Sequence, residues 1–123
     1  MNQLLFGDGQ ADRLAKLMDV ASLRARVHGA NIANQNTPGY KTKAVDFDAA
    51  FRAAVDSGQS VDDVEPQIYE PRATAEQADG NDVSVDREVM EQAQNNTLYN
   101  TYLALATGKK KLLTIAMSTA PGG

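Results

Sequence analysis

Two long stretches of this chain place apolar residues at alternating steps of four and three, which constrains the fold more than any other feature. In residues 11–34 one row contains Leu14, Met18, Ala21, Ala25, His28 and Ile32. A second row beside it contains Val20, Leu23, Val27 and Ala30. Such steps form a continuous stripe along an α-helix. The spacing predicts a long helix over 11–34, and its two rows indicate two packing neighbours.

The same spacing returns in residues 84–119. Its row runs through Val85, Val89, Gln92, Asn96, Tyr99, Leu103, Ala106, Lys110, Leu113 and Met117. A neighbouring row carries Leu98, Tyr102, Leu105 and Leu112. Ser84 is expected to cap this second helix, with Asp86 and Glu88 in its first turn. The polar members of the row either fix the register of the packing or mark the edge of a broad apolar face.

The segment between the two long helices has weaker patterns. A short helix is expected over 46–57, with Asp46 as its cap, Phe47, Phe51 and Val55 on one face, and Gly58 closing it. Residues 58–82 form an irregular connector in which Gln67-Ile68-Tyr69 has the character of a short edge strand. Residues 41–82 carry four basic against ten acidic residues, a net charge of −6, whereas 1–40 and 83–123 each carry +1.

These patterns predict a mainly α fold in one domain. It consists of a helix and turn motif (1–40), an acidic connector with a short helix (41–82) and a C-terminal helix (83–123). The two long helices pack as a coiled-coil-like hairpin. A hairpin buries one stripe on each helix, and each helix here has more than one. Because a fully buried Leu or Val contributes roughly 1.5–3 kcal/mol, we expect partner helices from other molecules.

A cluster of helix-stop and turn signals follows the first helix. Asn31, Asn34 and Asn36 weaken it, because Asn side chains compete with the helical hydrogen bonds. Pro38 moves Thr37 away from the α region, and Pro38-Gly39 fits the centre of a type II turn with positive φ at Gly39. Tyr40 has a ring and a polar tip suited to anchoring that turn.

Few residues here could carry chemistry. The chain has no Cys, and its one histidine, His28, lies on an apolar row, where a core or interface role is expected. Asp62-Asp63 with Glu65 lacks the spacing of a calcium loop, and Lys109 to Lys111 is the one basic run in an acidic chain. We therefore expect no catalytic, cofactor-binding or metal-binding residues, no small-molecule substrate and no nucleic-acid partner.

The turn motif also carries a resemblance. Ala30-Asn31-Ile32-Ala33-Asn34-x-x-Thr37-Pro38-Gly39-Tyr40-Lys41 resembles the N-terminal signature of the bacterial flagellar axial proteins. Within that group, Ala44-Val45-Asp46-Phe47 and Gly80-Asn81-Asp82-Val83-Ser84-Val85-Asp86 are similar to segments of the proximal rod family. Gln35-Asn36 departs from the pattern, in which a small residue precedes an acidic one.

The resemblance implies a non-enzymatic structural subunit of the flagellar basal body, exported without a cleaved signal peptide to the periplasmic rod. Its helices would line a helical tube, with other rod subunits, copies of itself and ring or export-gate proteins as partners. No apolar run approaches the roughly 20 residues of a membrane span, so an integral membrane protein is not expected. The motif Asn31, Asn34, Thr37, Pro38, Gly39 and Tyr40 would form a hinge for assembly. The expected helix-packing residues are Leu14, Met18, Val20, Leu23, Val27, Ile32, Val85, Val89, Tyr99, Leu103, Leu113 and Met117.

Two other functions share parts of these patterns. Another axial protein, such as a second rod type or a hook-junction subunit, would carry the same turn motif. A cytoplasmic coiled-coil adaptor or export chaperone would show the same helical spacing. An enzyme is the remotest alternative, because no constellation of side chains suits an active site.

Overall fold

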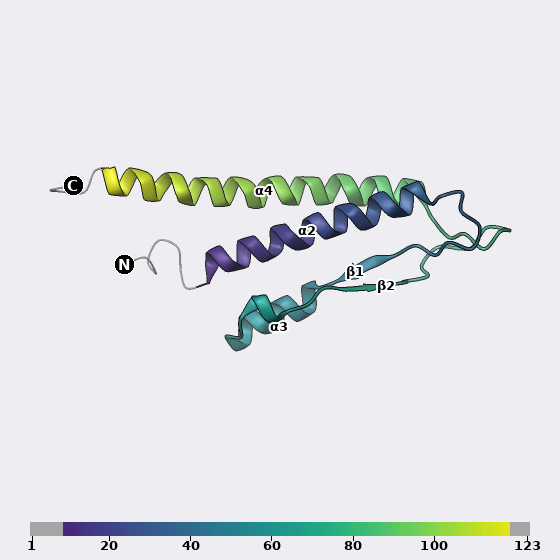
Figure 1. The fold of residues 1–123 in the computed structure, drawn as a ribbon, viewed down its shortest axis with the longest axis horizontal. Helices are drawn as coiled ribbons and strands as arrows, with labels where there is room; N and C mark the ends of the chain where they lie inside the picture. The colour runs from purple at the N-terminus through teal and green to yellow at the C-terminus, as the bar shows by residue number, and fades with distance from the viewer. Residues whose placement is uncertain (1–8, 119–123) are drawn as a thin grey trace.

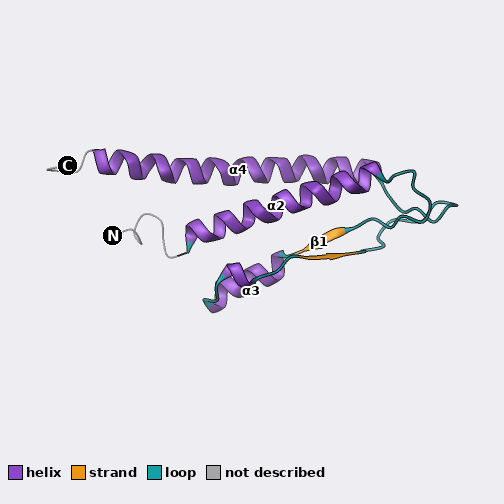
Figure 2. Ribbon diagram, viewed as in Figure 1, coloured by secondary structure: helices purple, strands orange, loops and turns teal. Residues whose placement is uncertain are grey.

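The structure is a computed structural model that describes residues 9–118. Two long helices, α2 (Gln10–Ala33) and α4 (Val85–Ser118), run side by side in opposite directions (Figure 1). Between them the chain forms β1 (Ala44–Asp46), α3 (Asp48–Ser57), the 3₁₀ turn η1 (Val61–Asp63) and β2 (Gln67–Tyr69). Helices dominate and the sheet is small (Figure 2). The predicted mainly α hairpin is confirmed.

The long helices begin and end within one residue of the predicted bounds wherever the chain is described; residue 119 lies outside that part. Ser84 caps α4 as expected, because its hydroxyl accepts a hydrogen bond from the backbone N–H of Arg87 at 3.4 Å. Asp86 and Glu88 lie in the first turn of α4. Gly58 ends α3 in the left-handed conformation, with φ of 77°. The stop and start signals in the sequence thus fixed these boundaries.

The start of the short helix was predicted wrongly. Asp46 does not cap α3; it ends β1, which pairs antiparallel with β2 so that Val45 lies opposite Ile68. This ladder requires an extended backbone through Asp46, and α3 therefore starts at Asp48. Phe47 takes the cap position with no side-chain cap bond; it is buried, and its ring lies 5.3 Å from that of Phe51. The predicted strand Gln67–Tyr69 is confirmed, whereas its partner was missed.

Helix α2 lies between α4 and the connector, which folds back along the opposite side of α2 (Figure 1). The row with Ala21, Ala25 and His28 faces α4. On another side of α2, Arg24 donates hydrogen bonds to the Val45 carbonyl at 3.4 Å and to Asp48 at 3.2 Å. The connector thus supplies the second neighbour of α2, a role that the sequence analysis gave to other molecules.

The core is small and has a large polar share. Its buried apolar residues in the described chain are Val20, Ala21, Val27, Phe47, Ala54, Val61 and Val83. The buried polar and charged residues are His28, Asn31, Asn81, Asp82, Glu88 and Asn95. Buried polar groups are costly unless each finds a hydrogen-bond partner, so they select one arrangement of the chain. Most of these buried polar residues lie at the junction between the two long helices and the connector.

Helix α4 presents much of its apolar surface to solvent. Its exposed large apolar residues are Val89, Met90, Leu98, Leu103, Leu105, Ile115 and Met117, and no residue of α2 belongs to this group. Helix α4 also extends beyond the start of α2 (Figure 1). No helix in the described part of the chain combines the length and the apolar character that crossing a membrane requires. The surplus apolar surface predicted for both helices therefore lies on α4.

Candidate functional site

The turn motif forms part of a tight corner where α2 ends, and we use this name, the corner, for the bonded segments 31–43 and 76–88. The Tyr40 N–H donates to the Thr37 carbonyl at 3.2 Å, which places Pro38 and Gly39 at the centre of a β-turn. Gly39 has φ of 74°, as predicted for this position. Asn34 supports the approach to the turn: its amide donates to the Ala30 carbonyl at 2.8 Å, and its oxygen accepts from the Thr37 hydroxyl at 3.0 Å. The turn itself is exposed, so Pro38 and Gly39 lie at the tip of the corner.

Asn31 is the centre of the corner and is completely buried. Its amide donates to the Lys43 carbonyl at 2.8 Å and, through a short hydrogen bond, to the Glu88 carboxylate. Its oxygen accepts from the Lys43 N–H at 3.0 Å and from the Tyr40 hydroxyl at 3.0 Å. One side chain thus joins α2, the segment between the turn and β1, and the first turn of α4. Asn31 and Asn34 thus both bond to backbone groups with their side chains, which is the competition with helical hydrogen bonds expected of Asn.

Tyr40 anchors the turn by its hydroxyl group, which is directed at Asn31. The ammonium of Lys43 lies 4.6 Å from the centre of the Tyr40 ring, a cation–π contact. Burial raises the pKa of the Tyr40 hydroxyl above its ordinary value of 10.0, and the carboxylates of Glu88 and Asp82 raise it further. Tyr40 therefore stays neutral and keeps its donor proton at physiological pH.

The chain segment before α4 closes the corner from the other side. Asn81 is completely buried, and its amide donates to the carbonyls of Asn34 at 2.9 Å and Thr37 at 2.8 Å. The Gly39 N–H donates to the Asp79 carbonyl at 2.9 Å. A Cβ on Gly80, which has φ of 85°, would lie 3.4 Å from the Gly39 Cα. The two glycines thus allow two loops to pass closely, and the ends of the connector are held together.

Thr42 and Lys41 extend this contact. The Thr42 N–H and hydroxyl bond to the side chain and the carbonyl of Asp82, respectively. Lys41 forms an ion pair with Glu76 and also donates to the Gly80 carbonyl. All of these contacts lie within the segments 31–43 and 76–88. The hydrogen-bonding roles of Asn81, Asp82 and Glu88 were not predicted, since their partners lie about 40 to 60 residues away in the chain.

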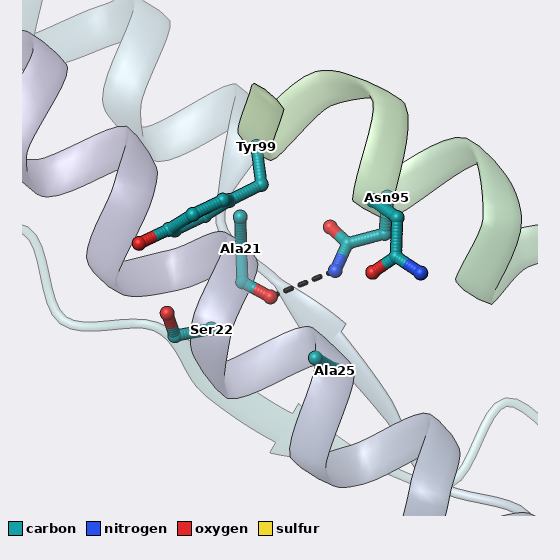
Figure 3. A pocket seen from close by; sticks show the side chains of 6 residues that line it. Ala21, Ser22, Ala25, Asn95 and Tyr99 are labelled. Carbon is teal, nitrogen blue, oxygen red and sulfur yellow. Dashed lines mark hydrogen bonds between the residues drawn. The ribbon is translucent and has the colours of Figure 1, made fainter. Parts of the chain in front are cut away.

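Polar contacts continue along the helix pair. Asn95 donates to the Ala21 carbonyl at 2.8 Å, and Gln92 donates to the Ala25 carbonyl at 3.2 Å. Near these contacts a shallow hollow of about 210 Å³ opens between α2 and α4, with the ring of Tyr99 lying beside Ala21 (Figure 3). These amides bond to carbonyls at fixed levels of α2. The bonds therefore fix the axial register between the two helices.

The predicted packing residues divide into three groups. Val20 and Val27 are buried, and six others are half-buried: Leu14, Met18, Leu23, Ile32, Val85 and Tyr99. Val89, Leu103 and Met117 are 53%, 45% and 67% exposed and do not serve the core of the pair. The row facing α2 keeps Val85, Gln92 and Tyr99 of the predicted row, but it passes through Glu88 and Asn95 instead of Val89 and Asn96. The side chain of Leu113 lies outside the described residues.

His28 is buried as predicted, but it has acidic partners that its own helix did not reveal. Its Nδ1 lies 3.2 Å from Oε2 of Glu88, and its Nε2 lies 3.9 Å from Oε2 of Glu91. Among the described residues, these three make the one group of His, Asp and Glu side chains that could hold a metal ion. No metal ligand was predicted from the sequence at these positions.

Comparison with known proteins places this architecture in a family, although no family model matches the chain. It is 31% identical over 112 residues to the flagellar basal body rod protein FlgB of Bacillus subtilis (strain 168), covering 82% of this chain and 87% of that protein. It is 29% identical over 114 residues to the FlgB of Escherichia coli (strain K12), covering 76% and 82%. The FlgB of Borrelia hermsii is 27% identical over 111 residues, covering 74% and 82%. At this identity and coverage, the chain belongs to the FlgB family of non-enzymatic flagellar basal body rod proteins.

Proposed function

We propose that this chain is a structural subunit of the proximal rod of the bacterial flagellum. One observation carries the proposal: α4 exposes large apolar side chains on more than one of its faces. Met90 lies on the side away from α2, whereas Val89 and Leu103 lie on one flank and Leu98 and Leu105 on the other. A helix that is apolar around most of its circumference needs neighbours on several sides. Packing in a tube of helices supplies such neighbours.

The partners would be other rod subunits and copies of this chain, with ring or export-gate proteins at the end of the rod. The three segments 1–40, 41–82 and 83–123 would act as one axial domain, with α4 between subunits and the acidic connector outside. The corner would hold the connector at a fixed angle to the helices. Export to the periplasmic rod without a cleaved signal peptide belongs to the same proposal.

A complementation experiment tests this role. Leu105→Lys places a charge on the exposed apolar face of α4, where Leu105 is 51% exposed and so contributes little to the fold of the single chain. In a strain lacking the native gene, this variant should be produced and exported normally but should be absent from purified basal bodies, and swimming should be lost. Gln59→Lys introduces the same charge at an exposed connector position and should be incorporated.

The outcome separates the proposal from its rivals. A Leu105→Lys chain that is incorporated as well as Gln59→Lys would refute the assembly role of α4. A wild-type chain that stays in the cytoplasmic fraction would favour the adaptor or chaperone. Density for the chain at the hook junction, away from the export gate, would favour another axial position. Each result is read by fractionation and by reconstruction of isolated basal bodies.

A further inference from the structure

We propose that His28, Glu88 and Glu91 form a binding site for a divalent transition-metal ion, with Zn²⁺ as its best fit. His28 comes from α2, and the two carboxylates come from adjacent turns of α4, three residues apart. One donor atom from each residue lies within 4.8 Å of the other two. The site would therefore join the two long helices beside the corner. It does not depend on where the chain stands in a rod.

The spacing of the donor atoms suits coordination. Zn²⁺ binds imidazole nitrogen and carboxylate oxygen at about 2.0–2.2 Å, so neighbouring ligands in a tetrahedral site stand about 3.4 Å apart. Nδ1 of His28 and Oε2 of Glu88 are 3.2 Å apart. A metal ion would take the place of the hydrogen that now lies between them. Oε2 of Glu91 lies 3.9 Å from the other ring nitrogen, Nε2, so Glu91 has to swing toward the Nδ1 side to complete the site. Its side chain, which is 43% exposed, has the freedom to make this movement.

The surroundings hold two of the three ligands in place. Glu88 is 1% exposed, and one of its oxygens is fixed by the Asn31 amide, which leaves the other oxygen directed at His28. Hydrogen bonds of this kind orient metal-binding carboxylates and raise metal affinity. A bound cation would also neutralise the buried Glu88 charge, which costs free energy when it is unpaired. The exposed side at Glu91 gives an entry path and room for a water ligand.

The donor set also selects the metal. One imidazole with two carboxylates suits Zn²⁺ and its neighbours in the transition series, whereas Mg²⁺ and Ca²⁺ prefer oxygen ligands alone. Three protein ligands with an open position describe a site that binds reversibly in exchange with solvent. Because the ligands come from both helices, the metal binds the paired state better than the unfolded chain. Binding should therefore raise both helix content and thermal stability.

The experiment titrates the full chain with ZnCl₂, using a chromophoric zinc indicator for affinity and circular dichroism for thermal unfolding. The wild-type chain should bind one Zn²⁺, and its Tm should rise, whereas MgCl₂ should leave Tm unchanged. Glu91→Gln removes a half-exposed ligand without touching the core, and it should weaken Zn²⁺ binding by about tenfold or more. His28→Gln should abolish it. Glu65→Gln, an exposed acid in the connector, is the matched control and should bind like wild type.

Two results would overturn the site. The first is a wild-type chain without saturable one-to-one Zn²⁺ binding. The second is Zn²⁺ binding that survives unchanged in Glu91→Gln and His28→Gln, since the ion would then sit elsewhere. Glu91→Gln also guards against misfolding as an explanation. Its metal-free spectrum and Tm should match those of wild type, so a lost response to Zn²⁺ in this variant reports the ligand itself.

Discussion

Removing the Asn31 side chain should cost more stability than any other single truncation in the turn motif. Asn31→Ala deletes two donated and two accepted hydrogen bonds at a completely buried position. It leaves the Glu88 carboxylate without its amide donor. It also leaves the Tyr40 hydroxyl and both backbone groups of Lys43 without their side-chain partner. The corner then loses the side chain that joins α2, the segment before β1 and the first turn of α4.

The magnitude follows from where those partners lie. Glu88 is 1% exposed, and losing a hydrogen bond to a buried charged group costs about 1.5–3 kcal/mol. Lys43 and Tyr40 are half-buried, so water replaces part of what they lose and each contributes about 0.5–1 kcal/mol. We expect Asn31→Ala to lower the free energy of unfolding by about 3–5 kcal/mol. Asn34→Ala, whose bonds stay within the turn, should cost about 1 kcal/mol.

Urea unfolding followed by circular dichroism at 222 nm measures both variants under conditions where the chain is monomeric. A double-mutant cycle of Asn31→Ala with Glu88→Gln isolates the pair, which should be coupled by about 1–2 kcal/mol. The reasoning fails if Asn31→Ala costs no more than Asn34→Ala. It also fails if the cycle shows no coupling, since Asn31 would then not be the partner on which the buried carboxylate depends.

Three further predictions concern single positions. The pKa of Tyr40 is raised in the folded state, so the stability that its neutral hydroxyl contributes should be complete below pH 10 and lost as the pH rises through the folded-state pKa. Tyr40→Phe should lower the free energy of unfolding by about 1 kcal/mol at pH 7. It should also flatten the loss of stability at alkaline pH in unfolding curves recorded against pH. Gly80→Ala should lower the free energy of unfolding by about 1–3 kcal/mol, because φ is 85° and the added Cβ contacts the backbone of Gly39. The control is Gly29→Ala, whose added Cβ has no atom within 4 Å and which should stabilise α2 slightly in the same urea assay. Asn95→Asp buries a carboxylate that cannot donate to α2, and it should lower the free energy of unfolding by about 3 kcal/mol at pH 7. Asn96→Asp changes an exposed residue and should be nearly neutral. Equal losses of Tm for the two variants would refute the assigned helix face.

The sequence determined the helices well because their signals are local. Apolar spacing, the Ser84 cap and the Gly58 stop all act within a few residues, and the observed bounds follow them. The start of α3 was missed because the conformation of Asp46 depends on a residue far away in the chain. Its strand pairing with Gln67 outweighs its preference for a helix cap. Two positions of the α4 row that faces α2 were misjudged for a related reason. Periodicity arguments place apolar residues inside, and here Glu88 and Asn95 are inside instead.

The candidate site was predictable only in part. The turn geometry at Gly39 and the anchoring role of Tyr40 follow from the chemistry of those residues alone. The partners of Asn31 and His28 do not, because Glu88 lies 57 and 60 residues away from them. A charged residue in the first turn of a helix has an adequate explanation in the helix dipole. Nothing in the neighbouring sequence reveals that the same side chain is buried against another helix.

The corner has a consequence for how this chain can vary in length. By bonding residues on both sides of the connector to each other, it holds the two ends of the connector together. Doubling the length of a flexible loop costs only about 0.6 kcal/mol in closure entropy. Insertions at the exposed residues Gly58 to Ser60 should therefore leave the helix pair unchanged. We therefore expect the connector to accept added sequence at this position while the helices keep the register that their polar contacts set.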